Sequence, residues 1–440
     1  MTNKEKNSMI SLKGRETRAK MRSQDVKVFE LKFDKSKISK QKLDNLKRLF
    51  IEGKWFTNYI IAKGITNSTS YIDYKVNKVS IKVKDAFEER VLNLLSSQMK
   101  QYIIKRLQSN IKALQKLDKN GKRTGKIKYI KALHSIPLMQ YGITYKVDIA
   151  NKSVHIQGLG DFKVSGLDQI PEGSEMATSN LIELNDDYFL HVVTYIPKQE
   201  KAQNKKASGI DLGIKDQIAF SNGIKVQYAI TLPERAKRLY HAFSKSAYNK
   251  ETKTRSKRGL KLLKKINKKF THANNEKKDI NNKIAHYIAE NYQYVAYQND
   301  SLRSWLKLYG RGIYQTSIGE FRNTLKRKVS TPLEIGRFEK TTGVCINCGA
   351  SVQLKLSNRV FTCPLCGYTL DRDVSAAMVI KIKGLSLWNI GETLVEDYAT
   401  TSSVLDYLKS IPHVKASIAV EARSSKQADR VVEALSVWAG

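Results

Sequence analysis

Residues 345–377 have the sequence CINCGASVQLKLSNRVFTCPLCGYTLDRDVSAA and contain all four cysteines of the chain: Cys345, Cys348, Cys363 and Cys366. Each Cys-x2-Cys pair is typical of a zinc knuckle, a tight turn that directs two thiolates toward one point. Two knuckles supply the tetrahedral set of four sulfur ligands that structural zinc prefers. A disulfide framework is disfavoured because cysteines grouped this closely in a lysine-rich chain suit metal binding better. The sequence therefore predicts a structural zinc ribbon over residues 341–370.

The composition predicts a polyanionic partner. The chain has 440 residues, enough for two or three domains, and its 78 Lys and Arg against 41 Asp and Glu give a net charge of +37. Nucleic acid is favoured because each phosphate contact releases condensed counterions. No apolar run approaches the ~18 residues of a membrane-spanning helix. Residues 1–24 are basic and have no apolar signal region, so we expect a disordered arm, no membrane partner and a cytoplasmic location.

The first half of the chain combines strand and helix patterns. Alternating apolar residues predict a strand near residues 25–35, and several short alternating segments separated by turn residues predict more strands over 136–198. Between them, a 3.6-residue period predicts helices from about residue 39 and at about 84–116. We therefore expect a small β-barrel with an inserted helical region at about 39–130. The polar, lysine-rich residues 199–206 are the expected linker.

The second half has the pattern of an α/β domain interrupted by the ribbon, with its first part at 207–340 and its last part at 371–440. A strand from Ala207 ends near Asp211, Gly213 turns the chain, and a second strand returns as a hairpin. Residues 235–292 predict a basic helical pair, and 294–297 predict a short buried strand. Residues 400–403 are expected to be a loop within a C-terminal extension, 383–440.

Carboxylates at strand ends can serve hydrolysis of a phosphodiester, which needs acids that converge on two Mg²⁺ ions ~3.5–4 Å apart. Asp211 is a candidate because it stands at the end of an expected central strand. An ordinary aspartate that caps the hairpin turn at Gly213 is the alternative.

The order of the motifs carries more information than any one of them. A Gly-Ile-Asp-Leu-Gly segment at 209–213, a basic helical pair, an acid after a short strand, a four-cysteine ribbon and Asp-Arg-Asp-Val-Ser-Ala-Ala at 371–377 follow one another. In this order the chain resembles the TnpB transposon-encoded proteins and their descendants, the compact type V-F CRISPR effectors. The resemblance implies an RNase-H-like RuvC nuclease domain split by the ribbon, and a wedge-like barrel with an inserted recognition region. It places the first and last RuvC acids on Asp211 and Asp373, while Ser375 stands where the family commonly has Asn.

The middle acid depends on the register chosen. The family carries a glutamate, often in Gln-Asp-Glu followed by Leu and Trp, and residues 298–305 here are QNDSLRSW. Matching the Gln, Leu and Trp places Asp300 at the glutamate position, whereas another register places Asn299 or Gln298 there. Aspartate is one methylene shorter and retracts its carboxylate by ~1.5 Å, and a shift of ~1 Å can cost ~100-fold in rate. A working nuclease and a weakened or absent one are both compatible with this sequence.

Basic residues crowd the helical region before the middle acid. Four lysines at 261, 264, 265 and 268 share one helix face, and the predicted nucleic-acid-binding residues are Lys257, Arg258, Lys261, Lys264, Lys265, Lys268 and Lys269. A solvated basic face, screened by salt, is the alternative.

Three functions follow from the resemblance and the charge. The first is RNA-guided, sequence-specific targeting of double-stranded DNA, with cleavage by two Mg²⁺ ions and with guide RNA, target DNA and a second copy of the chain on one guide as partners. The second is a nuclease-deficient form that acts in transcriptional control by recruiting a transcription-related protein. The third is a transposon DNA-binding protein that needs no RNA. All three predict a prokaryotic, nucleoid-associated protein.

Overall fold

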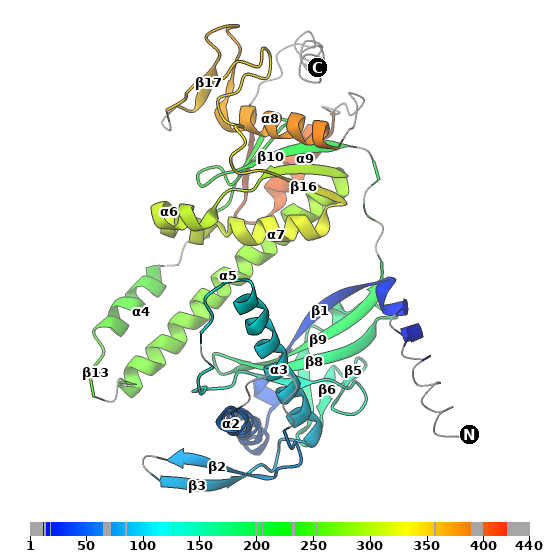
Figure 1. The fold of residues 1–440 in the computed structure, drawn as a ribbon, viewed down its shortest axis with the longest axis vertical. Helices are drawn as coiled ribbons and strands as arrows, with labels where there is room; N and C mark the ends of the chain where they lie inside the picture. The colour runs from blue at the N-terminus through cyan, green and yellow to red at the C-terminus, as the bar shows by residue number, and fades with distance from the viewer. Residues whose placement is uncertain are drawn as a thin grey trace. The chain divides into compact units, whose positions relative to one another are not determined.

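The structure is a computed structural model that describes residues 12, 15–17, 19–64, 72–83, 86–125, 127–198, 201, 203–204, 206–230, 234–251, 254–355, 358–388 and 399–419. The chain divides into two compact units, Met1–Gln199 and Glu200–Gly440, which are treated separately (Figure 1). About half of the expected disordered arm and the last 21 residues lie outside the described residues. No described helix is both long and apolar enough to cross a membrane.

The first unit contains a seven-stranded antiparallel sheet that forms a nearly closed barrel, in the order β4-β8-β9-β1-β7-β6-β5. Side chains alternate strictly along the longest strand, where Tyr188, Leu190 and Val192 point into the core. The N-terminal strand lies between strands from residues after 159. The strands are β1 Gln24–Phe33, β4 Ser135–Leu138, β5 Tyr145–Asp148, β6 Ser153–Ile156, β7 Gly160–Ser165, β8 Glu175–Leu184 and β9 Asp187–Pro197.

Helices and a small hairpin interrupt this barrel between β1 and β4, namely α2 Lys40–Ala62, β2 Lys78–Val83, β3 Ala86–Val91 and α3 Ser97–Lys119. Two short 3-10 helices, η1 Lys35–Lys37 and η2 Leu167–Gln169, complete the unit. The helix expected at about 84–116 therefore begins later than predicted, and the inserted region is not wholly helical. Its start is set by Ser96, whose hydroxyl accepts a hydrogen bond from the Met99 N–H at 3.3 Å.

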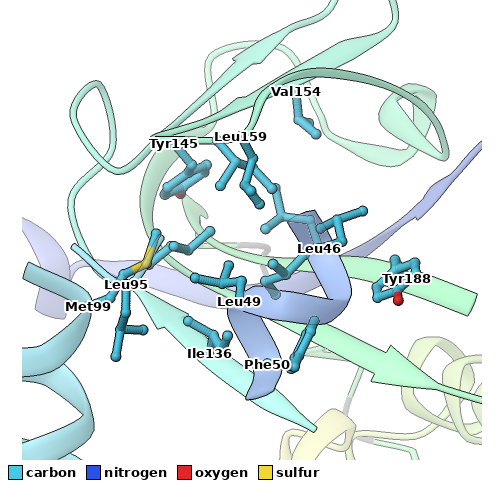
Figure 2. Close-up of a cluster of buried hydrophobic side chains, with 14 of the residues drawn as sticks. Leu46, Leu49, Phe50, Leu95, Met99, Ile136, Tyr145, Val154, Leu159 and Tyr188 are labelled. Carbon is cyan, nitrogen blue, oxygen red and sulfur yellow. The ribbon is translucent and has the colours of Figure 1, made fainter. Parts of the chain in front are cut away.

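The core of this unit lies between α2 and the sheet. Figure 2 shows Leu46, Leu49 and Phe50 of α2 pointing toward side chains of the barrel strands. The ring centroids of Phe50 and Tyr188 are 6.0 Å apart, a distance at which aromatic rings attract one another. Leu46 and Leu49 have no exposed surface, so burial of the apolar face of α2 is what fixes this helix on the barrel.

The second unit is built on a six-stranded mixed sheet in the order β16-β15-β10-β11-β12-β19. β15 and β16 run parallel to β10, whereas β11, β12 and β19 each run antiparallel to the preceding strand. The strands are β10 Ala207–Leu212, β11 Ile218–Phe220, β12 Ile224–Gln227, β15 Tyr294–Gln298, β16 Thr331–Ile335 and β19 Lys415–Ile418.

The helices of this unit are α4 Glu234–Ser244, α5 Lys257–Asn291, α6 Leu302–Thr316, α7 Ile318–Lys328, α8 Arg372–Leu387 and α9 Ala399–Ser410. In Figure 1, α7, α8 and α9 lie close to the sheet, whereas α4 and one end of α5 extend away from it. Two further hairpins are β13 Tyr248–Asn249 with β14 Thr254–Arg255, and β17 Val360–Thr362 with β18 Thr369–Asp371. α8 packs so closely on β10 that a Cβ on Gly209 would lie 2.0 Å from the Ala377 carbonyl oxygen. The small residues at 209, 376 and 377 are what permit this approach.

The C-terminal extension differs from the expectation of a loop at 400–403. These residues belong to α9, because Val404, Leu408 and Ile411 repeat at helical spacing and are buried in the core of the unit. β19 then pairs with β12, with Ile418 opposite Ile224. Residues 399–419 are therefore part of the second unit's fold.

Candidate metal centres

The four cysteines converge on one point. The Sγ atoms of Cys345 and Cys366 are 3.5 Å apart, as are those of Cys348 and Cys363, and all four lie within 4.8 Å of one another. A disulfide would need about 2.05 Å. Sulfurs at the corners of a zinc tetrahedron with Zn–S bonds of about 2.3 Å are about 3.8 Å apart. The donor set therefore fits structural zinc.

The knuckles owe their shape to two glycines. Gly349 and Gly367 have positive φ angles of 72° and 70°, and their N–H groups donate to the carbonyls of Cys345 and Cys363. Hydrogen bonding to Asn347 lowers the pKa of Cys366 to about 6, whereas burial raises the pKa of Cys345 to about 12, so a bound zinc would be what favours the thiolate of Cys345. The turn residues of both knuckles thus direct the sulfurs inward.

The three predicted acids meet at one edge of the second unit's sheet. Asp211 is near the end of β10, Asp300 is two residues beyond β15, and Asp373 is in the first turn of α8. β10 and β15 are parallel neighbours, so their carboxyl ends lie at the same edge. Burial, followed by the negative charges of Asp373 and Asp300, raises the pKa of Asp211 to about 8. Burial also raises the pKa of Asp300, against the opposing charge of Arg322.

The hydrogen bonds around residues 298–300 bear on the register of the middle acid. The Gln298 amide donates to the Glu339 carbonyl oxygen at 2.8 Å and accepts from the Thr341 hydroxyl at 2.7 Å. The Asn299 amide donates to Glu334 at 3.3 Å. Both side chains are therefore engaged with β16 and the segment after it, whereas the Asp300 carbonyl oxygen accepts from Arg322 of α7 at 3.1 Å.

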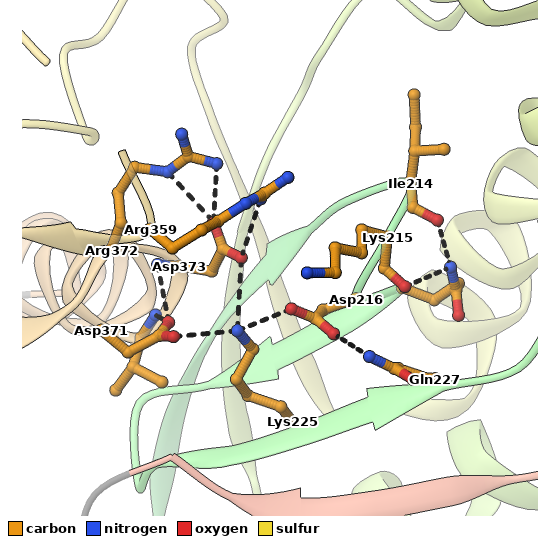
Figure 3. A network of polar contacts seen from close by, with 11 residues as sticks. Ile214, Lys215, Asp216, Lys225, Gln227, Arg359, Asp371, Arg372 and Asp373 are labelled. Atoms are coloured by element: carbon orange, nitrogen blue, oxygen red, sulfur yellow. Dashed lines mark hydrogen bonds and ion pairs between the residues drawn. The ribbon is translucent and has the colours of Figure 1, made fainter. Parts of the chain in front are cut away.

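The sequence did not reveal a lysine that lies among the acids. Figure 3 shows Lys225 of β12, whose Nζ lies 2.6 Å from Asp216, 2.9 Å from Asp371 and 3.5 Å from Asp373. Burial lowers the pKa of Lys225, but hydrogen bonds to Asp216 and Asp371 outweigh burial and raise it. The sequence pattern that could have indicated this residue is a lysine between two apolar residues, Ile224 and Val226, in the hairpin that follows Asp211.

Arginines also hold Asp373. Its Oδ1 accepts from Arg372 at 3.2 Å, and its Oδ2 lies 3.9 Å from Arg359. Asp371 has a different role, because its Oδ1 accepts the N–H groups of Asp373 and Val374 and so caps α8. Within the described part of the chain, the four cysteines are the one group of three or more His, Cys, Asp or Glu side chains placed so that they could hold a metal ion.

The pKa of Asp211 predicts how stability depends on pH without Mg²⁺. Its folded pKa of about 8 exceeds the ~3.9 of an unfolded aspartate, so folding favours the protonated form. The contribution of Asp211 to the free energy of unfolding is therefore greatest below about pH 4 and is lost as the pH rises to about 8. We expect Asp211→Asn to flatten the difference between urea midpoints at pH 5 and pH 8. If the difference between the two urea midpoints were the same in Asp211→Asn as in the wild type, the raised pKa of Asp211 would be contradicted.

All seven predicted nucleic-acid-binding residues lie on α5. Six are exposed, and Lys269 is half-buried. The first turn of α5 holds Lys257 and Arg258 and no acid, which concentrates positive charge at a helix N-terminus that already favours anions. Arg255, just before this helix, is instead structural: its guanidinium lies over the rings of Phe243 and Tyr248.

A barrel unit, an α/β unit with acids at one sheet edge, and a four-cysteine ribbon are the combination that the resemblance to TnpB-like proteins led us to expect. Residues 319–380 match the family model "Cas12f1-like, TNB domain", and residues 190–299 match the model "Probable transposase". The resemblance to TnpB-like proteins and Cas12f-type effectors, inferred from the order of the motifs, is confirmed by these matches together with curated relatives.

Three TnpB-like proteins of Acanthamoeba polyphaga mimivirus are 26% identical to the chain over 226 residues, 46% of its length. The match covers 42%, 42% and 41% of those proteins, so the chain spans less than half the length of these curated relatives. A chain in a cryo-EM structure of a Cas12f1–sgRNA–target DNA complex is also similar, with a TM-score of 0.39 and 15% identity over 78% of this chain and 80% of that one.

Proposed function

We propose that the chain is an RNA-guided protein that targets double-stranded DNA by sequence, with a RuvC-like second unit whose acids are Asp211, Asp300 and Asp373. The observation that carries the proposal is their placement: Asp211 and Asp300 follow the carboxyl ends of the parallel neighbours β10 and β15, and Asp373 begins α8, which packs on β10. The sheet supports an RNase-H-like assignment, because an antiparallel three-stranded meander is extended by two parallel strands on the side of β10.

The donor chemistry of these acids fits Mg²⁺, which takes oxygen ligands. Two bound ions would activate a water and stabilise the leaving oxygen of a phosphodiester. Asp211 sits on a rigid strand and would bind as the carboxylate. The backbone of Asp300 is held in place, because the Arg322 guanidinium donates a hydrogen bond to the Asp300 carbonyl oxygen at 3.1 Å. Asp373 is fixed at the start of α8 by the cap that Asp371 provides.

The exposed cations of α5 are proposed to contact the phosphate backbone of a guide RNA paired with target DNA. Backbone contacts of this kind supply affinity without reading sequence, which base pairing with the guide would provide. The zinc ribbon would hold the segment that leads into Asp373. A second copy of the chain on one guide is proposed by resemblance, and the mass of the purified complex tests it.

A nuclease-deficient RNA-guided DNA-binding protein is the second candidate. Two observations favour it: an aspartate occupies the middle position, and Asp373 is already bound by Lys225, Arg359 and Arg372. In that case the bound protein would act in transcriptional control or recruit a protein partner.

Cleavage of a guide-matched plasmid in Mg²⁺ distinguishes the two candidates. The protein is purified with its co-expressed RNA, and that RNA is sequenced. If the proposed nuclease is active, Asp211→Asn lowers the cleavage rate at least ~100-fold, because one carboxylate of the metal site is lost. Asp168→Asn, at an exposed position of the first unit, is the matched control.

The same assay with Asp300→Glu measures the effect of the shorter side chain, and we expect a higher rate from the longer one. RNA-dependent DNA binding without cleavage would establish the second candidate. DNA binding that needs no discrete RNA species would contradict both candidates.

A further inference from the structure

We propose that Lys225 is a tethered cation that competes with a divalent metal ion for Asp373, and thereby limits metal binding at the acid site. This inference rests on the proposed function, because it assigns Asp373 to a metal site. It concerns a lysine that lies beside the acids but outside the motifs at residues 209–213 and 371–377.

The location of Lys225 gives the first argument. Ile224 and Val226 on either side of it are wholly buried, so the alternation of β12 directs Lys225 to the opposite face. Its side chain is only 12% exposed, and its ammonium meets three carboxylates at 2.6, 2.9 and 3.5 Å. An ammonium group has three N–H donors, so its hydrogen-bonding capacity matches this set.

The partners of Lys225 give the second argument. Asp216, which is 6% exposed, also accepts from the Gln227 amide and would pair Lys225 without help from the ribbon side. Lys225 nevertheless reaches Asp371 and Asp373, which begin the last segment of the acid site. It therefore contributes charge at the site as well as a structural ion pair.

The occupancy of Asp373 gives the third argument. Oδ1 is bound by Arg372, and Oδ2 is shared by Lys225 and Arg359. A Mg²⁺ ligand must bring a free lone pair to about 2.0–2.1 Å from the ion. An ion bound at Asp373 would share this carboxylate with the Lys225 ammonium, and the two positive charges would repel each other at close range.

Binding of Mn²⁺, followed by electron paramagnetic resonance, tests the proposal without nucleic acid. The full chain, loaded with zinc, is titrated with Mn²⁺ as wild type, Lys225→Met, Lys225→Arg and Asp373→Asn. Loss of a unit charge a few ångströms from a divalent ion should tighten binding about tenfold or more in Lys225→Met. Lys225→Arg, which keeps the charge, should bind like wild type. Adding Asp373→Asn to Lys225→Met should remove the gain.

Unchanged or weaker Mn²⁺ binding by a folded Lys225→Met protein would overturn the proposal, since a purely structural lysine can only weaken the site when it is lost. Lys225→Met leaves the Asp216 carboxylate without its ion-pair partner and could therefore fail to fold. In that case the double variant Asp216→Asn with Lys225→Met is used, because it removes this carboxylate as well. This double variant should bind Mn²⁺ more tightly than Asp216→Asn alone, and equal affinity would overturn the proposal. A gain in Mn²⁺ affinity without cleavage by any variant would count against the nuclease and leave the role of Lys225 standing.

Discussion

Cys363→Ser is expected to release the zinc and disorder the ribbon. The Cys363 side chain is 1% exposed, and its sulfur lies 3.5 Å from that of Cys348. Among the described residues of the ribbon, Phe361 is the one large apolar side chain that is buried in one cluster with Cys345 and Cys363, so we expect the metal to supply most of the stability. Structural zinc binding is worth about 10–16 kcal/mol in comparable peptide sites, and a serine hydroxyl replaces a thiolate poorly.

The loss should extend to the acid site, because the ribbon strand β18 ends at Asp371 and α8 begins at the next residue. Elemental analysis should show one zinc per chain in the wild type and far less in Cys363→Ser, with DNA cleavage or Mn²⁺ binding reduced in parallel. Thr362→Ser, at the exposed neighbouring position, is the control and should keep its zinc. Full zinc content in Cys363→Ser would show that three cysteines suffice.

Gly209→Ala is expected to be the most damaging small substitution in the second unit. The added Cβ would lie 2.0 Å from the Ala377 carbonyl oxygen and 2.5 Å from the Lys381 nitrogen. Both are backbone atoms of α8, so no side chain can rotate away and the helix itself must shift. Overpacking costs about 1–3 kcal/mol where side chains can adjust, and a backbone clash should reach the top of that range or exceed it.

A shifted α8 would also move Asp373 away from Asp211, and a displacement of ~1 Å can cost ~100-fold in rate. We expect a lower urea midpoint together with loss of cleavage or Mn²⁺ binding. Gly310→Ala is the matched control: its Cβ would meet nothing within 4 Å, and because Gly310 directly follows the kink at Tyr309 in α6, we expect stability close to that of the wild type. Wild-type stability in Gly209→Ala would refute the close packing of α8 on β10.

Local patterns in the sequence anticipated much of this architecture. The cysteine knuckles are determined by residues within a few positions of one another, and the barrel strands show their alternation directly. The predicted start of α3 was wrong because the apolar residues Val91 and Leu94, which precede the helix, happen to continue its 3.6-residue period. Val91 instead pairs with Lys78 in the β2–β3 hairpin. α9 was missed because its serines and threonines resemble a loop, although Val404 and Leu408 carry the helical spacing.

Contacts between distant residues determine the rest of the candidate site. Asn299 faces Glu334, and Gln298 faces Glu339 and Thr341, so the register of the middle acid depends on a segment that comes after α7. Lys225 contacts Asp371 and Asp373, although the helices α4 to α7 and the ribbon lie between these residues in the sequence. No spacing rule connects such positions, and only the folded sheet brings them together.

The pairing of β19 with β12 has a consequence for synthesis on the ribosome. β12 carries Lys225 and is made early, yet its outer edge stays unpaired until residues 415–418 have emerged. Asp373 likewise emerges long after Asp211. The acid site therefore cannot be complete until residue 373 has been made, and the sheet gains its β12–β19 pairing only after residue 418. A chain interrupted before residue 415 would therefore leave this edge of β12 unpaired and open to pairing with another strand.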